Sequence, residues 1–311
     1  MECPFPPPPP LPGSLAEGVP LASRTTWRIG GRARWLATFK DVVDLLWFWT
    51  RLDPLTPRFV LGGGSNLLIN DEGFGGVVLD LTSGLNRIQV EESPASVLSV
   101  QAGALTRTLA HTARRLGLGG AEFLAGIPGS IGGAVVMNAG AHGREMKDIL
   151  IDAQLLDPQG RQHSLTPDAL AMSYRQSRIP PGWLVLSARL RLTPEDPERI
   201  RQTMQRYNRH RLAAQPVGQP SAGSTFKNPV AAPPAWQLIE AAGLRDASIG
   251  QARVSSKHCN FFVNMGQATA TDMRQLVGKV RDAVFDHSGI RLESEVEYLG
   301  RLGLEPMVRY C

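Results

Sequence analysis

The chain has 311 residues, a formal net charge of +5 and a hydrophobic fraction of 42%. This apolar fraction is enough for a packed core, so it argues against disorder over most of the chain, and the length favours about two domains. Three isolated cysteines argue against a disulfide scaffold, six scattered histidines give no metal-site spacing, and no apolar run is long enough to cross a membrane. We therefore expect a cytoplasmic protein with neither a secretory signal nor a bound metal.

Local patterns predict alternating helices and strands in the first two thirds of the chain. Seven of the first 13 residues are proline. This composition predicts that residues 1–23 form a disordered tail and that the fold starts near Thr25. Apolar periodicity with glycine or proline boundaries then predicts helices over 41–52 and 105–116, and strands over 58–61, 76–81, 149–156 and 183–192. The sequence Asp157-Pro158-Gln159-Gly160 predicts a type I turn that opens a hairpin.

A change of composition at residues 193–197, Thr-Pro-Glu-Asp-Pro, predicts a linker. Beyond it the same patterns predict helices over 199–212, 234–242 and 271–288, and strands over 260–264 and 295–299. The fold class is therefore predicted to be α+β, with one domain at 24–195, a smaller α+β domain at 199–302 and a C-terminal tail at 303–311.

Two segments concentrate glycine where the chain is expected to leave a strand. The first is residues 61–68, Leu-Gly-Gly-Gly-Ser-Asn-Leu-Leu, and the second is residues 126–143, of which six are glycine. Glycine allows backbone N–H groups to converge on a pyrophosphate, and a helix beginning at Ser130 would add its own N–H groups. One such loop alone is more often a tight turn, but two in one domain favour a large phosphate-bearing cofactor. Neither segment is a Walker A or a Rossmann fingerprint.

These segments belong to a longer series of motifs along the chain. The earlier motifs are Thr26-Trp27-Arg28-Ile29-Gly30-Gly31, residues 62–68, residues 120–123 with 126–143, and Tyr174-Arg175-Gln176-Ser177. The later ones are residues 221–229 (SAGSTFKNP), 257–261 (KHCNF) and 292–296 (LESEV). Together these motifs resemble the UDP-N-acetylenolpyruvoylglucosamine reductases, also called UDP-N-acetylmuramate dehydrogenases. They follow the family's order over residues 24–300, so the combined match is far more specific than any single motif.

The resemblance implies a flavoenzyme of bacterial peptidoglycan precursor synthesis. Its fold is implied to be a two-subdomain FAD-binding module of the PCMH/vanillyl-alcohol-oxidase type, followed by a smaller substrate-binding domain. In the implied reaction NADPH passes hydride to FAD, and the reduced flavin passes it to the vinyl carbon of UDP-N-acetylglucosamine enolpyruvate, giving UDP-N-acetylmuramate.

Matching positions imply three catalytic residues. Arg175 stabilises the charge that develops on the substrate, Ser224 donates the proton to carbon, and Glu295 also stabilises charge. A carboxyl group beside developing negative charge helps only if it is protonated or donates a hydrogen bond, so we expect burial to raise the pKa of Glu295.

The resemblance also implies binding residues at matching positions. Those implied to contact FAD are Gly62, Gly63, Gly64, Ser65, Asn66, Leu67, Gly126, Ile127, Pro128, Gly129, Ser130, Gly132, Gly133, Asn138 and Arg211. Those implied to contact the substrate are Tyr174, Lys227 and Asn228. Because the 199–302 segment leaves little room for an insertion, the chain resembles the family's shorter class, which lacks an extra tyrosine-bearing loop.

Each of the three implied catalytic residues also has a purely structural interpretation. An isolated arginine is usually solvated, Ser-Ala-Gly-Ser is turn-like by itself, and Glu293, Glu295 and Glu297 alternate as acids do on a solvent-facing strand. One alternative function is another FAD-dependent oxidoreductase of the same fold, such as a sugar or lactone oxidase, which shares the glycine loops but not the Ser224 and Glu295 motifs. Another is a non-catalytic basic nucleotide- or RNA-binding protein, although clustered aromatic residues and a continuous basic run are lacking.

Positive charge is concentrated in the last third of the sequence. Residues 199–311 carry fifteen basic and nine acidic side chains, and residues 199–227 carry five arginines, one lysine and no acid. Such a region attracts small anions, including a diphosphate sugar with a carboxylate and a phosphorylated dinucleotide. We therefore expect small-molecule partners and neither nucleic acid nor membrane. The oligomeric state and the preference for NADPH over NADH stay open.

Overall fold

The chain forms two compact units, each built from separate stretches of sequence. The computed structural model describes residues 7–10, 15–93 and 96–308. The first unit comprises residues 1–16, 36–63 and 78–211, and the second comprises residues 17–35, 64–77 and 212–311. The units differ from the contiguous domains expected from composition, since the last changeover follows Arg211 rather than the 193–197 segment.

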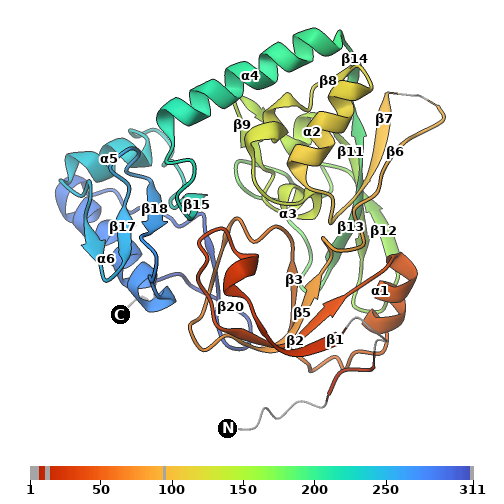
Figure 1. Ribbon diagram of the computed structural model, residues 1–311, viewed down its shortest axis with the longest axis horizontal. Helices are drawn as coiled ribbons and strands as arrows, with labels where there is room; N and C mark the ends of the chain where they lie inside the picture. Colours follow the sequence, from red (N-terminus) through yellow and green to blue (C-terminus); the bar gives the residue numbers. More distant parts are fainter. Residues whose placement is uncertain (1–6, 11–14, 94–95, 309–311) are drawn as a thin grey trace. The chain divides into compact units, whose positions relative to one another are not determined.

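An antiparallel sheet dominates the first unit. Its five strands have the order β12-β11-β13-β7-β6, and the short helix α3 packs against β13 and β7 (Figure 1). The helices of this unit are α1 (Val42–Trp49), α2 (Thr106–Arg115), α3 (Ile131–Val136) and most of α4 (Pro197–Ala214), with 3-10 turns η2 (Glu122–Gly126) and η3 (Met146–Asp148). Its strands are β3 (Arg58–Leu61), β6 (Ile88–Val90), β7 (Val97–Gln101), β8 (Leu118–Gly119), β9 (Gly140–Ala141), β10 (Arg144–Glu145), β11 (Leu150–Leu156), β12 (Gln162–Leu165), β13 (Leu184–Arg191) and β14 (Thr193–Pro194).

The second unit contains a four-stranded antiparallel sheet with the order β15-β18-β17-β16 and a three-stranded sheet with the order β20-β19-β4. In the smaller sheet β19 runs parallel to β4. The helical elements are η1 (Ala22–Arg24), α5 (Ala235–Ala241) and α6 (Ala270–Ser288). The strands are β4 (Leu67–Ile69), β15 (Ser221–Ser224), β16 (Ser248–Ile249), β17 (Ala252–Val254), β18 (Phe261–Asn264), β19 (Glu297–Leu299) and β20 (Leu304–Glu305). The remaining strands, β1 (Leu15–Pro20), β2 (Arg32–Thr38) and β5 (Phe74–Asp80), join β3 in the order β1-β2-β5-β3.

Buried aromatic residues explain why residues 17–35 belong to the second unit. The Trp27 indole is fully buried and donates from Nε1 to the carbonyl of Phe262 at 2.7 Å. Asn264 returns a hydrogen bond from Nδ2 to the carbonyl of Trp27 at 2.9 Å. Phe226 and Phe262 pack edge to face in the same core, with centroids 5.9 Å apart. A segment distant in sequence therefore completes this core.

Helix α6 shows how residues 64–77 join the same unit. Thr269 and Asp272 form a capping box at its start, and Gly289 ends it in the left-handed conformation at φ 71°. The Asp71 carboxylate accepts hydrogen bonds from the N–H groups of Ala270 at 2.6 Å and Thr271 at 2.9 Å. The predicted helix over 271–288 that ends at Gly289 is confirmed.

Two predicted tails contain ordered elements. Residues 15–20 form β1 and residues 22–24 form η1, so the predicted disorder over 1–23 is wrong for this part. The backbone N–H of Leu21 donates to Gly31 at 3.0 Å, a pairing with a later strand region that local composition does not reveal. Strand β20 lies within the predicted tail 303–311. Residues 1–6, 11–14 and 309–311 of these tails lie outside the described residues.

Within the described ranges, no helix combines the length and apolarity needed to span a bilayer. The α+β class itself is confirmed.

Candidate active site

The two glycine-rich segments lie against each other in the first unit. A Cβ atom added to Gly62 would lie 2.4 Å from Ser130 Oγ, and one added to Gly63 would lie 2.6 Å from the Cα of Gly129. Real Cβ atoms do not approach backbone so closely, so the contact with Gly129 requires glycine at position 63, and a Cβ at position 62 would displace the Ser130 hydroxyl. The structure therefore brings Gly62 and Gly63 of the first segment into contact with Gly129 and Ser130 of the second.

Backbone donors converge where these segments meet. Among the residues that the structure describes, the N–H groups of Gly62, Gly63 and Gly129 have no hydrogen-bond acceptor. Unused N–H groups in a glycine cradle without a Cβ are what a pyrophosphate requires. This geometry fits a phosphate-bearing cofactor.

The start of α3 does not add free donors, contrary to the expectation for a helix beginning at Ser130. The N–H groups of Ile131 and Gly132 donate to the carbonyls of Ala104 and Ala102, both at 2.8 Å. The N–H of Gly133 donates to the Oγ of Ser130, the N-cap residue, at 3.4 Å. The helix end is thus satisfied within the unit, and Ser130 and Gly132 shape the loop.

Other predicted cofactor residues surround this cradle or lie in the second unit. Arg211 is half-buried near Gly126, whose added Cβ would lie 3.5 Å from Arg211 Cδ, and burial lowers the pKa of its guanidinium. Ile127 donates its N–H to Leu124, and the carbonyl of Ile127 accepts from the Thr106 hydroxyl at 2.5 Å, directly before Pro128. Gly64, Ser65, Asn66 and Leu67 belong to the second unit, where Gly64 at φ 59° abuts the carbonyl of Arg24.

Tyr174 and Arg175 lie on a tight turn of the first unit. The backbones of Ser173 and Gln176 exchange hydrogen bonds of 2.9 and 3.1 Å, and Arg175 takes a positive φ of 55°. Arg175 Nη2 donates to the carbonyl of Gly140 at 3.0 Å, and its guanidinium carbon lies 5.3 Å from the Tyr174 ring centroid. The turn therefore holds a partly exposed aromatic ring beside a fixed guanidinium.

A hairpin of β9 and β10 carries Gly140 and rests on α4. Its tip residue His142, at φ 55°, stacks on Tyr207 with ring centroids 3.9 Å apart and an interplanar angle of 4°. The pKa of His142 is lowered, mainly because the ring is partly buried and to a smaller extent because His210 and Arg206 lie nearby. The stack makes His142 a packing residue of this hairpin.

Ser224 and Glu295 lie on neighbouring segments of the second unit. Glu295 donates its N–H to the carbonyl of Thr225 at 2.9 Å, and Lys227 donates its N–H to the carbonyl of Glu293 at 2.9 Å. Ser224 ends β15, and within the described chain its hydroxyl has no hydrogen-bond partner. The backbone register thus places a half-buried carboxyl beside the segment that carries an available hydroxyl.

Two asparagines fix these segments, and sequence analysis did not identify this function for either one. Asn260, 3% exposed, accepts from the Phe226 N–H at 2.9 Å and donates to its carbonyl at 2.8 Å. Asn66 donates from Nδ2 to the carbonyl of Glu295 at 3.0 Å, and its own carbonyl accepts from Glu297 at 3.1 Å. The KHCNF motif contained Asn260, but nothing in the sequence indicated which backbone it would hold.

The predicted substrate contacts of this unit already have protein partners. Lys227 Nζ lies 2.6 Å from Glu293 Oε1, and Asn228 Oδ1 accepts the Ala235 N–H at 3.0 Å at the start of α5. Lys227 and Asn228 therefore help to fix the segment that follows Ser224.

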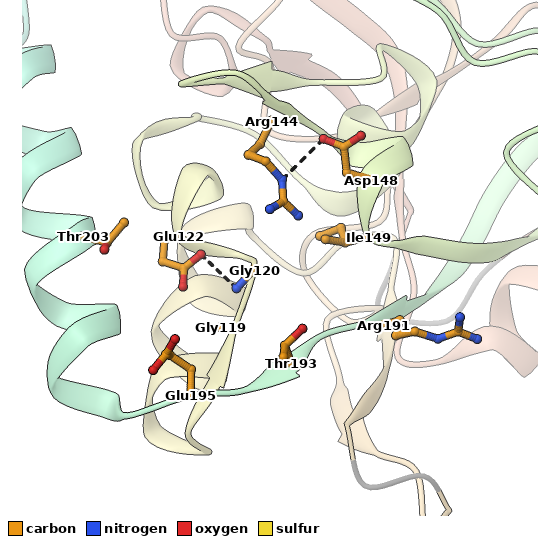
Figure 2. Close-up of a pocket in the computed structure, with 10 residues that line it drawn as sticks. All are labelled: Gly119, Gly120, Glu122, Arg144, Asp148, Ile149, Arg191, Thr193, Glu195 and Thr203. Atoms are coloured by element: carbon orange, nitrogen blue, oxygen red, sulfur yellow. Dashed lines mark hydrogen bonds and ion pairs between the residues drawn. The ribbon is translucent and has the colours of Figure 1, made fainter.

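A separate cavity of about 400 Å³ lies in the first unit beside β8, β10 and α4. Figure 2 shows Glu122 turned back to the Gly120 N–H, at 2.9 Å, and Arg144 facing Asp148, at 3.4 Å. Three acids and two arginines line it, and none of the predicted site residues does. Its mixed charge does not favour a phosphate-bearing ligand.

The chain matches two family models. Residues 52–166 match an FAD binding domain, and residues 215–299 match the C-terminal domain of UDP-N-acetylenolpyruvoylglucosamine reductase.

Relatives and a solved structure extend this similarity over nearly the whole chain. A protein of Magnetococcus marinus named UDP-N-acetylenolpyruvoylglucosamine reductase is 49% identical over 293 residues, 94% of each chain. A protein of the same name from Rhodopseudomonas palustris is 44% identical over 292 residues, also 94% of each chain. The crystal structure of a UDP-N-acetylenolpyruvylglucosamine reductase from Thermus caldophilus is similar with a TM-score of 0.79 at 37% identity, covering 91% of this chain and 97% of that one.

Proposed function

Because the chain belongs to the UDP-N-acetylenolpyruvoylglucosamine reductase family, we propose that it reduces UDP-N-acetylglucosamine enolpyruvate to UDP-N-acetylmuramate with NADPH. As a member of this family it is an oxidoreductase of peptidoglycan precursor synthesis, and residues 52–166 are its FAD-binding domain. Two observations carry the proposal, one in each unit. In the first unit, unused N–H groups form the cradle at Gly62, Gly63 and Gly129. In the second unit, the Ser224 hydroxyl lies on the segment beside Glu295 and has no hydrogen-bond partner among the described residues. Both substrates are soluble nucleotides, so a cytoplasmic location is part of the proposal.

The cradle in the first unit supports binding of the FAD pyrophosphate. Its N–H groups supply donors, and Arg211 beside Gly126 supplies positive charge close to the same loop. FAD held by the N–H groups of Gly62, Gly63 and Gly129 would supply the hydride-transfer chemistry between NADPH and the vinyl carbon of the substrate. The protein must then stabilise the resulting negative charge and supply one proton.

Arg175 stabilises that charge in the proposed reaction. A guanidinium can bind a carboxylate through two parallel hydrogen bonds, and such a contact strengthens as the carboxylate gains electron density. The hydrogen bond from Arg175 Nη2 to the carbonyl of Gly140, at 3.0 Å, restricts the conformation of the Arg175 side chain before substrate binds. Tyr174, beside this guanidinium, is proposed to contact the substrate.

Ser224 donates the proton to the carbon, and Glu295 stabilises the developing charge as a protonated or hydrogen-bond-donating group. A serine hydroxyl is a weak acid in water, but a carbanionic centre is basic enough to take its proton. Lys227, fixed by Glu293 at 2.6 Å, lies three residues after Ser224 and is proposed to bind the substrate with Asn228.

Substrate-dependent NADPH consumption tests this function. The purified protein, saturated with FAD, is mixed with NADPH in the presence and absence of UDP-N-acetylglucosamine enolpyruvate, and NADPH absorbance is followed without oxygen. We expect consumption only with the substrate and one UDP-N-acetylmuramate formed per NADPH. A flavin-loaded protein that consumes no NADPH with this substrate, but reduces oxygen with a sugar or lactone, would assign it to the oxidase alternative instead.

A further inference from the structure

Asn138 is buried beside the turn that carries Arg175, and its side chain is fully used by the protein. It has 0% exposure and takes a positive φ of 39°. Its Nδ2 donates to the carbonyl of Ser173 at 2.8 Å and to Glu145 Oε2 at 2.9 Å, while its Oδ1 accepts from the Lys147 N–H at 3.0 Å. Both amide hydrogens and the carbonyl oxygen therefore have partners within the first unit.

These partners lie on the elements that position Arg175. Ser173 begins the tight turn in which Arg175 sits, and its backbone closes that turn through Gln176. Glu145 belongs to β10, which pairs with β9 in register Glu145↔Gly140. Gly140 in turn accepts the hydrogen bond from Arg175 Nη2.

We propose that Asn138 is a positioning residue for Arg175, and that it makes no direct contact with the cofactor. One amide hydrogen holds the turn from which the Arg175 side chain leaves, and the other holds the hairpin whose carbonyl receives its guanidinium. Arg175 is thus fixed at both ends through one buried side chain. The inference rests on the proposed role of Arg175 in charge stabilisation.

The residue type follows from this arrangement. The site needs two donors and one acceptor within a short side chain, which asparagine supplies. It also needs a left-handed backbone, which asparagine tolerates better than most residues. Aspartate has the same shape but would place a carboxylate oxygen against the Ser173 carbonyl and the Glu145 carboxylate.

Separate measurement of the two half-reactions tests the inference. In anaerobic stopped-flow experiments on the FAD-loaded enzyme, NADPH reduces the flavin, and the reduced enzyme is then reoxidised by UDP-N-acetylglucosamine enolpyruvate. For Asn138→Asp and Asn138→Gly, which both tolerate the backbone conformation, we expect reoxidation to slow by about 10-fold to 100-fold, since small misplacements of a charged group have effects of this size. Flavin reduction and the FAD dissociation constant should stay within about 2-fold of the wild-type values.

Asn264→Asp is the matched control. Asn264 is also buried, donates to the Trp27 carbonyl at 2.9 Å and accepts from Gly266 and Ala268 at 2.8 and 2.9 Å, but it serves the core of the second unit. Replacing the Asn264 amide by a carboxylate should lower the stability of the protein without changing the ratio of the two half-reaction rates. In the Arg175→Ala background, Asn138→Gly should slow reoxidation no further, because the group that it positions is gone.

The outcomes separate this inference from the function on which it rests. If Arg175→Ala alone reoxidises at the wild-type rate, the proposed role of Arg175 is wrong, and the positioning role is overturned with it. If Arg175→Ala is slow while both Asn138 variants are normal, only the positioning inference is overturned. A rise of about 10-fold or more in the FAD dissociation constant of both variants would make Asn138 a cofactor residue and would also overturn it.

Discussion

At Gly63, the absence of one methyl group allows the two glycine segments to meet. Its missing Cβ would lie 2.6 Å from the Cα of Gly129, whereas a Cβ at Gly133 would lie 3.7 Å from Ser130 Oγ, an ordinary contact. Both glycines belong to the segments predicted to bind FAD. Their surroundings therefore assign them different roles, which the repeated glycine pattern alone does not distinguish.

This difference predicts opposite effects of alanine at the two sites. Gly63→Ala should separate the segments, destabilise the protein by about 1–3 kcal/mol as overpacking does, and weaken FAD binding. Gly133→Ala, within helix α3, should stabilise by about 0.5–1 kcal/mol and retain FAD. Thermal unfolding and titration with FAD measure both effects. Equal FAD affinity in the two variants would contradict the cradle.

Ser224 offers the most direct test of a single catalytic group. Ser224→Ala should keep flavin reduction by NADPH but slow substrate reduction by about 10²-fold to 10⁴-fold, the usual contribution of a positioned proton donor. Ser221→Ala, on the same strand β15, is the control and should slow neither step. Anaerobic stopped-flow absorbance separates the two steps. Normal substrate reduction by Ser224→Ala would show that another group supplies the proton.

Among the secondary-structure elements, the β11–β12 hairpin forms where its turn sequence predicted it. Gly160 donates to the Asp157 carbonyl at 3.0 Å, closing the predicted turn, and the Asp157 side chain accepts from Gln159 and Arg161 N–H groups and from the His163 ring. Burial raises the pKa of Asp157, but these hydrogen bonds more than offset it, so its pKa lies below the ordinary value.

The lowered pKa of Asp157 predicts a pH-dependent contribution to stability. This contribution is complete above the unfolded-state pKa of about 3.9 and is lost as the pH falls through the lower folded-state pKa. Asp157→Asn should therefore reduce Tm near neutral pH, and its difference from wild type should shrink below about pH 4. Asp168→Asn, at an exposed position, is the control. Melting curves from pH 3 to 8 test this, and a constant difference in Tm would contradict it.

Elements that depend on local chemistry were predictable, and those that depend on distant partners were not. Strand β3 matches its predicted bounds, and α1 begins after Asp41, whose side chain caps it. Strand β1 was missed because its partners come from residues 31 onward, while its own sequence follows a proline run. Helix α3 was anticipated, but the carbonyls of Ala102 and Ala104 that occupy its N–H groups could not be.

The same limit applies to the site. Motifs identified Arg175, Ser224 and Glu295 as candidates, and the structure assigns the first to one unit and the other two to the second. No local pattern indicates that Asn66 holds the Glu295 backbone or that Asn138 holds the turn before Arg175. Those functions depend on hydrogen bonds between residues far apart in sequence.

At the scale of the whole molecule, the positive charge is not concentrated in one unit, although the sequence analysis placed it in the last third of the chain. The five arginines between 199 and 211 lie on the α4 portion of the first unit, where Arg199 and Arg201 pair with Glu195 and Glu198. The second unit carries fourteen basic and twelve acidic residues, a net of +2, and the first carries nineteen and sixteen, a net of +3. Attraction of anionic substrates is therefore a property of particular side chains rather than of one charged domain.

Single-turnover reoxidation tests the central claim most directly. The FAD-loaded enzyme is reduced with one equivalent of NADPH without oxygen and mixed with UDP-N-acetylglucosamine enolpyruvate, while flavin absorbance and product are followed together. We predict rapid return of the oxidised flavin spectrum with one equivalent of UDP-N-acetylmuramate. A reduced flavin that persists with this substrate and is reoxidised only when oxygen is admitted would contradict the account.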